Sequence, residues 1–174
     1  MNRMRPTVLT FGLISGAVSS LLMLMTVPFM DRIGFDKGEV IGYTLIVASL
    51  LPVFFGIRSY RENVGGGAVS FGRAFAVGLL ISVISCACYV VTWEFVYFKL
   101  APDFADKFSA YAIEKARASG ATPEKIDETA RQMQQFKAMY DQPLVNAAIT
   151  FMEPFPIGLI ITVVSAAILK RKPS

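Results

Sequence analysis

The sequence predicts an all-α, polytopic membrane protein with four transmembrane helices and an extracytoplasmic helical hairpin between helices 3 and 4. Two observations support this fold class. Hydrophobic residues make up 54% of the 174 residues, and the mean hydropathy is +0.52. The charged residues, 17% of the chain, cluster between long uncharged stretches. A membrane imposes this distribution, because a charge at the centre of a transmembrane helix costs roughly 2.5 to 3.5 kcal/mol.

The uncharged stretches set the expected spans within a single membrane domain, residues 1–174. We expect spans at about residues 7–30, 40–57, 73–98 and 147–169. The first stretch reaches roughly 36 Å at 1.5 Å per residue, enough to cross a bilayer. A secretory signal peptide is the alternative for this stretch, but a cleavable signal has an apolar part of only about 7 to 15 residues. Pro52 predicts a bend in the second span, because proline donates no backbone hydrogen bond.

The distribution of Lys and Arg predicts the orientation. Basic residues flank the span ends on one side, against the single acid Glu62: Arg3, Arg5, Arg58, Arg61, Arg73, Lys170, Arg171 and Lys172. Because cytoplasmic flanks carry the excess of Lys and Arg, we expect both termini in the cytoplasm. The basic residues are spread over several span ends, where they can meet anionic headgroups, and this argues against a nucleic-acid partner.

The segment of residues 99–142 is expected to form two amphipathic helices on the opposite side. Phe104, Phe108 and Tyr111 recur at helical spacing before a turn at Gly120. A second helix then begins with Thr122 as its N-cap and a proline in its first turn. In one interpretation the two helices pack on each other and on the ends of spans three and four. In the other, the aromatic stripe lies on the outer leaflet or binds a partner.

Glu94 and Glu153 are the two carboxylates near the interior of a predicted span, which makes them candidate functional residues. Both can lie at headgroup level, beside an aromatic belt. The alternative is a paired or protonatable site between spans three and four. Two prolines support the second interpretation, because Pro154 and Pro156 should break the fourth span and free the carbonyls of Thr150 and Met152. Together with Glu153, two polar side chains form a stripe that runs into this break at intervals of four and three: Asn146, Thr150 and Glu153.

Small residues at intervals of four predict close helix packing in the first and fourth spans. They are Gly12, Gly16 and Ser20, and Gly158, Thr162 and Ala166. Such faces let helices approach closely, either within one chain or between chains of a homo-oligomer. One face of the third span also carries polar groups, which we interpret as interhelical hydrogen-bonding groups: Ser82, Ser85, Tyr89 and Thr92.

The residue types present argue against cofactor chemistry. The chain has no histidine, and its two cysteines, Cys86 and Cys88, are two apart and point to nearly opposite sides of a helix. We therefore expect no metal, no other cofactor and no catalytic nucleophile with its base. The run Gly65 to Gly67 lacks the Lys-Ser/Thr of a phosphate-binding loop and is interpreted as a turn.

Two segments resemble a bacterial four-helix membrane family that is defined only as a domain of unknown function. The first contains Arg58, Tyr60, Arg61, the glycine run, Ser70, Phe71, Ala74, Phe75 and Gly78. The second contains Glu153, Pro154, Pro156, Gly158, Leu159 and the basic end from Lys170 to Lys172. The resemblance implies four helices in a bacterial inner membrane and no particular reaction.

These features predict a non-enzymatic accessory or structural component of the cytoplasmic membrane. Its expected partners are the lipid bilayer and either another membrane protein or a second copy of the chain. The alternative function is a small carrier or proton-coupled subunit that uses Glu153 and Glu94. A membrane-embedded enzyme acting on lipid is a third interpretation, which would require a hydroxyl or carboxylate pair at the interface.

Overall fold

Four helical rods of membrane-spanning length form the body of the computed structural model, which describes residues 4–171. The rods are Arg5–Ile33, Phe35–Asn63, Phe71–Leu100 and Pro143–Leu169, each apolar enough to cross a membrane. They extend beyond the expected spans. All regular elements of the described residues are helices, apart from one isolated β-bridge. The predicted all-α fold class with four membrane helices is confirmed.

Several rods are composed of more than one helical element. The elements are α1 (Arg5–Thr26), a 3-10 turn (Val27–Phe29), α2 (Met30–Ile33), α3 (Phe35–Leu50), α4 (Pro52–Asn63), α5 (Phe71–Phe95) with a π-helical turn (Val96–Leu100), α6 (Phe104–Ala118), α7 (Pro123–Tyr140), α8 (Pro143–Phe151) and α9 (Pro154–Leu169). Two of the breaks stand at the predicted prolines, Pro52 and Pro154, because proline has no N–H for the preceding turn. At the first break the Ser15 hydroxyl of α1 donates a hydrogen bond of 2.5 Å to the Ser49 carbonyl.

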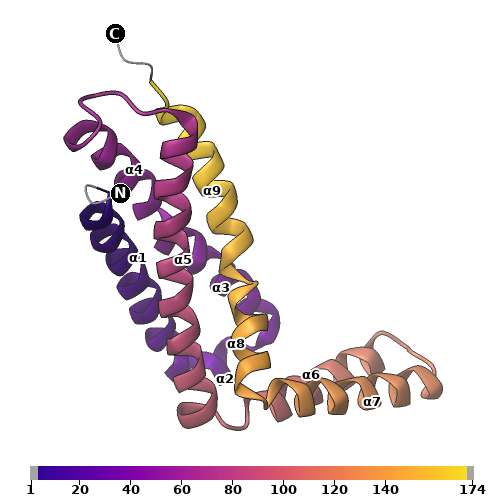
Figure 1. The fold of residues 1–174 in the computed structure, drawn as a ribbon. Coiled ribbons are helices and arrows are strands. Elements are labelled where there is room, and N and C mark those ends of the chain that lie inside the picture. The colour runs from indigo at the N-terminus through magenta and orange to yellow at the C-terminus, as the bar shows by residue number, and fades with distance from the viewer. Residues whose placement is uncertain (1–3, 172–174) are drawn as a thin grey trace.

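The central rod of the bundle is α5, which packs along α1 on one side and along α9 on the other. Both chain ends lie at one end of the bundle (Figure 1). At the other end, α6 and α7 run side by side and project sideways from the bundle instead of continuing its axis. The two helices form a hairpin that turns at Gly120, whose positive φ of 75° suits glycine. As predicted, Thr122 caps α7 by accepting a hydrogen bond from the Lys125 N–H.

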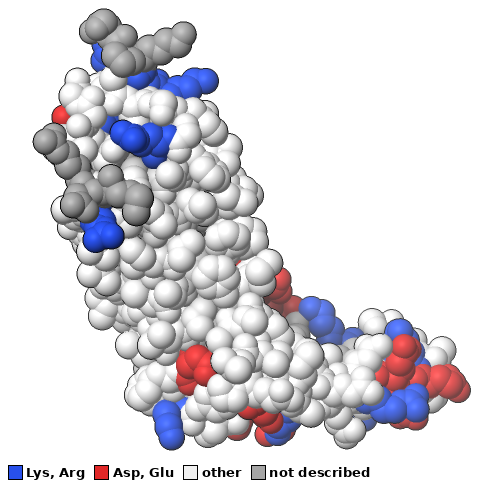
Figure 2. All heavy atoms as spheres, viewed as in Figure 1, with Lys and Arg blue, Asp and Glu red and all other residues white. Residues whose placement is uncertain are grey.

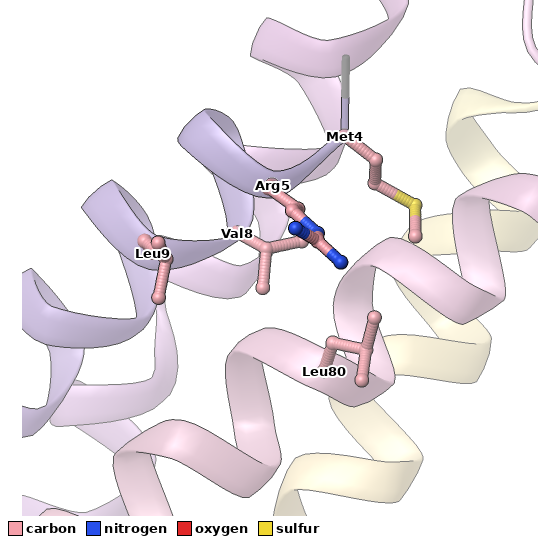
Figure 3. Close-up of a pocket in the computed structure, with 5 residues that line it drawn as sticks. All are labelled: Met4, Arg5, Val8, Leu9 and Leu80. Atoms are coloured by element: carbon pink, nitrogen blue, oxygen red, sulfur yellow. The ribbon is translucent and has the colours of Figure 1, made fainter. Parts of the chain in front are cut away.

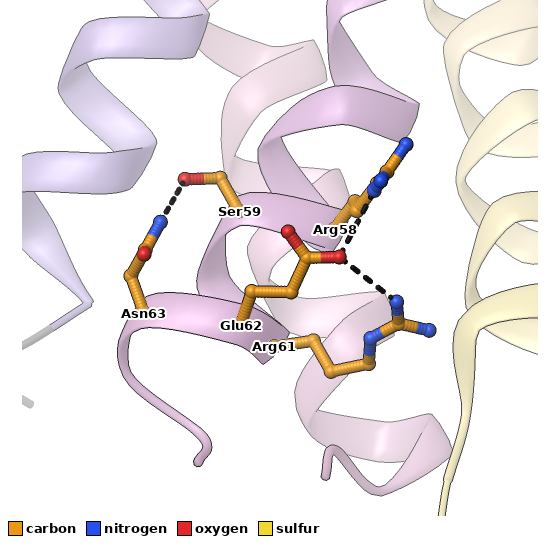
Figure 4. Close-up of polar contacts among 5 residues, drawn as sticks. All are labelled: Arg58, Ser59, Arg61, Glu62 and Asn63. Carbon is orange, nitrogen blue, oxygen red and sulfur yellow. Dashed lines mark hydrogen bonds and ion pairs between the residues drawn. The ribbon is translucent and has the colours of Figure 1, made fainter. Parts of the chain in front are cut away.

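The end of the bundle that holds the termini carries most of the uncompensated basic residues. Figure 2 shows Lys and Arg at this end, an almost uncharged body, and mixed charges around the hairpin. Arg58 and Arg61 both pair with Glu62, at 3.0 and 3.1 Å (Figure 4). The loop after α4 is joined to the end of α9 by the antiparallel bridge between Val69 and Arg171. Two of the basic residues in the orientation argument, Arg3 and Lys172, lie outside the described residues.

Candidate functional site

The candidate residue Glu153 lies at the break between α8 and α9, and its partner is a tyrosine of the third span. The Tyr89 hydroxyl donates a hydrogen bond of 3.0 Å to Glu153 Oε2. The Glu153 side chain remains exposed on the bundle, and Tyr89 is half-buried. At 1.5 Å per residue, Glu153 stands roughly 15 Å along the fourth rod from Pro143. The arrangement provides an accessible carboxylate with a fixed hydroxyl donor well inside the length of the bundle.

Asn146 and Thr150 belong to a different, buried network that fastens the hairpin to the bundle. Thr150 Oγ1 donates to Asn146 Oδ1 at 3.2 Å, and Asn146 Nδ2 donates to the backbone carbonyl of Tyr140 at 3.2 Å. The Tyr140 hydroxyl accepts a hydrogen bond of 2.8 Å from Trp93 Nε1 and lies 3.3 Å from Thr150 Oγ1. Since the one proton of Thr150 goes to Asn146, Tyr140 is the donor to Thr150. We call these four residues the polar junction.

The predicted polar stripe is therefore divided at the proline break. Asn146 and Thr150 are fully buried, whereas Glu153 is exposed and points to another partner. The expectation of a free Thr150 carbonyl is also wrong, because the Glu153 N–H bonds to it at 3.3 Å. In a continuous helix the Thr150 carbonyl would accept from residue 154, but Pro154 has no N–H. The last turn of α8 tightens instead, so that the donor is the N–H of Glu153, three residues after Thr150. Pro156 lies in the first turn of α9.

Glu94 and Glu153 do not form a pair. No hydrogen bond within residues 4–171 joins them, and the Glu94 Oε1 atom is buried without a partner. An unpartnered buried carboxylate oxygen is costly, since it has lost water and gained no donor. Both acids act on Tyr140 instead: burial raises the pKa of this tyrosine, and the charges of Glu153 and Glu94 raise it further.

The hairpin has a second attachment that the sequence did not reveal. Phe35, at the start of α3, packs among three rings of α6, with centroid distances of 5.6 Å to Phe104, 5.4 Å to Phe108 and 5.1 Å to Tyr111. The aromatic stripe of α6 is thus covered by Phe35 and, toward α7, by Phe136. This arrangement supports the interpretation in which the hairpin packs on itself and on the bundle.

Charged groups surround this second attachment. Lys107 pairs with Asp31 at 2.8 Å, and Lys115 pairs with Asp36 at 2.7 Å. Hydrogen bonds to these carboxylates raise the pKa of both lysines, so both stay charged at neutral pH. The pairs are exposed, and exposed pairs contribute little to stability. The aromatic contacts of Phe35 therefore provide most of this second attachment.

The small residues of the first and fourth spans face α5 of the same chain. A Cβ added at Gly12 would lie 2.9 Å from Ile84, and one at Gly16 would lie 2.6 Å from the Cys88 sulfur. A Cβ at Gly158 would lie 3.0 Å from the Ser82 Cβ. Thr162 and Ala166 are buried on the same helix. These contacts place the predicted packing faces inside one chain.

The polar face of the third span is joined by hydrogen bonds to two neighbouring rods, the first and the fourth. The distances between hydroxyl oxygens are 3.2 Å from Ser82 Oγ to Thr162 Oγ1, 2.9 Å from Ser85 Oγ to Ser15 Oγ, and 2.7 Å from Thr92 Oγ1 to Ser20 Oγ. With Tyr89 and Glu153, each of the four predicted groups makes an interhelical hydrogen bond. That prediction is confirmed. In lipid such contacts replace part of the hydrophobic driving force that is absent between transmembrane helices.

The fold and these contacts define a multi-pass integral membrane protein with four spanning helices and a lateral helical hairpin. Residues 10–171 match the family described as "Protein of unknown function (DUF4199)", and the chain belongs to that family. The predicted family resemblance is thereby confirmed. No curated protein and no solved structure matches the chain. The family description assigns no activity.

Proposed function

We propose that the protein is a non-enzymatic accessory component of the bacterial cytoplasmic membrane, which uses its hairpin to hold a membrane-protein partner or a second copy of the chain. The observation that carries this proposal is the double attachment of the hairpin. The polar junction fixes one end of α7, and Phe35 fixes α6. A segment fixed in this way presents its outer face in one orientation, and preorganisation lowers the entropic cost of binding.

The proposed orientation places both termini in the cytoplasm and the hairpin on the extracytoplasmic side. Among the described residues, the end that holds the termini has one acid, Glu62, and a larger set of basic residues: Arg5, Arg58, Arg61, Arg73, Lys170 and Arg171. The positive-inside rule assigns such an end to the cytoplasm. The hairpin carries paired charges of both signs, including Lys125 with Glu128 and Lys137 with Asp106, which suits a solvated surface.

Site-specific photo-crosslinking in native membranes tests the accessory role. A photoreactive amino acid at Arg117 or Lys125, whose side chains are both 61% exposed, should give a protein adduct of one defined mass. The matched control is Ile160, 64% exposed on α9, where only lipid should be captured. Tyr140→Phe, which loosens the polar junction, should lower the adduct yield from both hairpin positions. Protein adducts from Ile160 and none from the hairpin would contradict the proposal.

A second candidate function is a proton-coupled carrier subunit, and the contact of Tyr89 with Glu153 favours it. An exposed carboxylate roughly 15 Å along a spanning helix is costly when ionised, so it favours proton uptake or a bound cation. Its position beside a helix break resembles the discontinuous helices with which transporters build ion sites. Glu94 would be a secondary group, since it lacks any contact with Glu153 among the described residues.

Proton flux into proteoliposomes separates the second candidate from the first. If Glu153 transfers protons, Glu153→Gln should abolish a pH-driven signal, and Tyr89→Phe should reduce it. Glu114→Gln is the matched control, because it removes a carboxylate that is 75% exposed on the hairpin, outside the spanning rods. No flux through the wild-type protein, or equal flux through Glu153→Gln, would eliminate the carrier function.

A further inference from the structure

A groove opens between α1 and α5 at the basic end of the bundle. It has a volume of about 300 Å³ and is lined by Met4, Arg5, Val8, Leu9 and Leu80 (Figure 3). One turn deeper the two helices touch, because a Cβ at Gly12 would lie 2.9 Å from Ile84. The groove therefore closes toward the middle of the bundle and opens toward the basic end.

The lower walls of the groove are apolar and face the lipid. Leu9 is 52% exposed, Leu80 is 42% exposed, and Leu13, one turn below Leu9, is 56% exposed. These side chains continue from the groove along the outer surface of the two helices. Such a track fits an acyl chain, which gains dispersion contacts on both sides without leaving the hydrocarbon region.

Two arginines stand above this apolar track without an acidic partner. Arg5 lines the groove itself, and within residues 4–171 it forms no ion pair. Arg73 lies seven residues before Leu80, which places it on the same face of α5, and it too has no ion pair in the described part of the chain. By contrast, Arg58 and Arg61 share Glu62 (Figure 4).

The helix register places the two arginines at neighbouring heights. Gly12 packs at Ile84 and Gly16 at Cys88, so residues of α5 lie level with residues of α1 that are 72 positions earlier. This offset puts Arg5 level with Val77, and Arg73 roughly 6 Å closer to the basic end at 1.5 Å per residue. Two long side chains at this spacing can reach one phosphate from two sides.

We propose that this groove binds an anionic phospholipid, with its phosphate between Arg5 and Arg73 and one acyl chain along Leu9, Leu13 and Leu80. Arginine suits the headgroup, because its planar guanidinium binds phosphate oxygens through two parallel hydrogen bonds. Basic pockets between transmembrane helices select anionic headgroups on charge. The apolar walls select a lipid over a free anion. This site is independent of the accessory role proposed for the hairpin.

Native mass spectrometry of the detergent-solubilised protein tests the site, with phosphatidylglycerol and phosphatidylcholine of equal chain length as probes. The wild-type protein should bind phosphatidylglycerol more tightly. Arg5→Gln should weaken this binding about fivefold, the factor expected for one basic residue near a membrane surface, and Arg73→Gln should act similarly. Arg58→Gln, which removes a cation from the same end but outside the groove, should change the affinity less than about twofold.

Two further arms separate a lipid site from diffuse charge attraction and from a phosphate site. Leu80→Trp fills the groove without changing charge, so it should lower phosphatidylglycerol binding while phosphatidylcholine binding stays the same. Millimolar inorganic phosphate, compared with chloride at equal ionic strength, should not compete. Equal losses in Arg5→Gln and Arg58→Gln, unchanged binding in Leu80→Trp, or competition by inorganic phosphate would each overturn the proposal.

Discussion

The indole Nε1 of Trp93 donates a hydrogen bond of 2.8 Å to the hydroxyl of Tyr140, and this contact links the third span to the last turn of α7. The Tyr140 hydroxyl passes its own proton toward Thr150, which is 1% exposed and in turn donates to Asn146. The chain of donors leaves no member of the junction unpaired. A polar group that is buried and fully paired in this way favours a single orientation of the elements it joins.

Removing the hydroxyl of Tyr140 should destabilise the folded protein by about 1 to 3 kcal/mol, because Trp93 loses its acceptor and Thr150 loses a donor. Unfolding of Tyr140→Phe in detergent, compared with the wild type, measures this loss. The matched control is Tyr60→Phe, since Tyr60 is also buried, at 5% exposure, and its hydroxyl has no hydrogen-bond partner within residues 4–171. Equal stability of the two variants would show that the junction is unimportant.

Close packing of α1 on α5 depends on Gly16, where an added Cβ would lie 2.6 Å from the Cys88 sulfur and 2.7 Å from its Cβ. Gly16→Ala should cost about 1 to 3 kcal/mol through overpacking. Cys88→Gly removes both opposing atoms, so the double variant should recover part of the loss in a double-mutant cycle. Gly42→Ala is the control, because a Cβ there meets nothing within 4 Å and should be neutral or mildly stabilising. Purely additive effects of Gly16→Ala and Cys88→Gly would refute the contact.

Phe35 is the aromatic side chain of α3 that covers the α6 stripe, and its loss should loosen the hairpin without unfolding the bundle. In Phe35→Ala we expect faster amide hydrogen exchange in α6, around Phe104 to Tyr111, and unchanged exchange in α5. Phe29→Ala is matched in size and lies at the same end of the bundle, but Phe29 is 50% exposed. It should leave α6 protected. Protection of α6 in Phe35→Ala equal to that of the wild type would contradict the assigned role.

Features set by local chemistry could be predicted from the sequence. The breaks at Pro52 and Pro154 follow from a missing N–H, and the turn at Gly120 follows from its backbone freedom. The hydrogen-bonding face of the third span follows from helical periodicity, because Ser82 and Ser85 point to the same side as Tyr89 and Thr92.

Features set by contacts between distant segments could not be predicted. Phe35 reaches a stripe that lies about 70 positions later, and nothing in its own surroundings indicates that partner. The predicted polar stripe of the fourth span runs through a helix break, and beyond the break regular helical spacing no longer fixes the direction of a side chain. Glu153 therefore points away from Asn146 and Thr150. Helical spacing predicts that Tyr89 lies on a hydrogen-bonding face of the third span. It does not predict Glu153 as the acceptor, because that contact depends on how the third and fourth rods pack.

Cysteine labelling of intact cells tests the central claim, that a four-span bundle displays its hairpin on the side opposite to its basic end. The wild type is the background, since its two cysteines, Cys86 and Cys88, both lie within the third rod. With a membrane-impermeant maleimide, Ser119→Cys at the hairpin turn should be labelled in intact cells. Asn63→Cys at the basic end should be labelled only after the membrane is opened. Labelling of both positions from the same side, or labelling of Asn63→Cys alone in intact cells, would contradict the account.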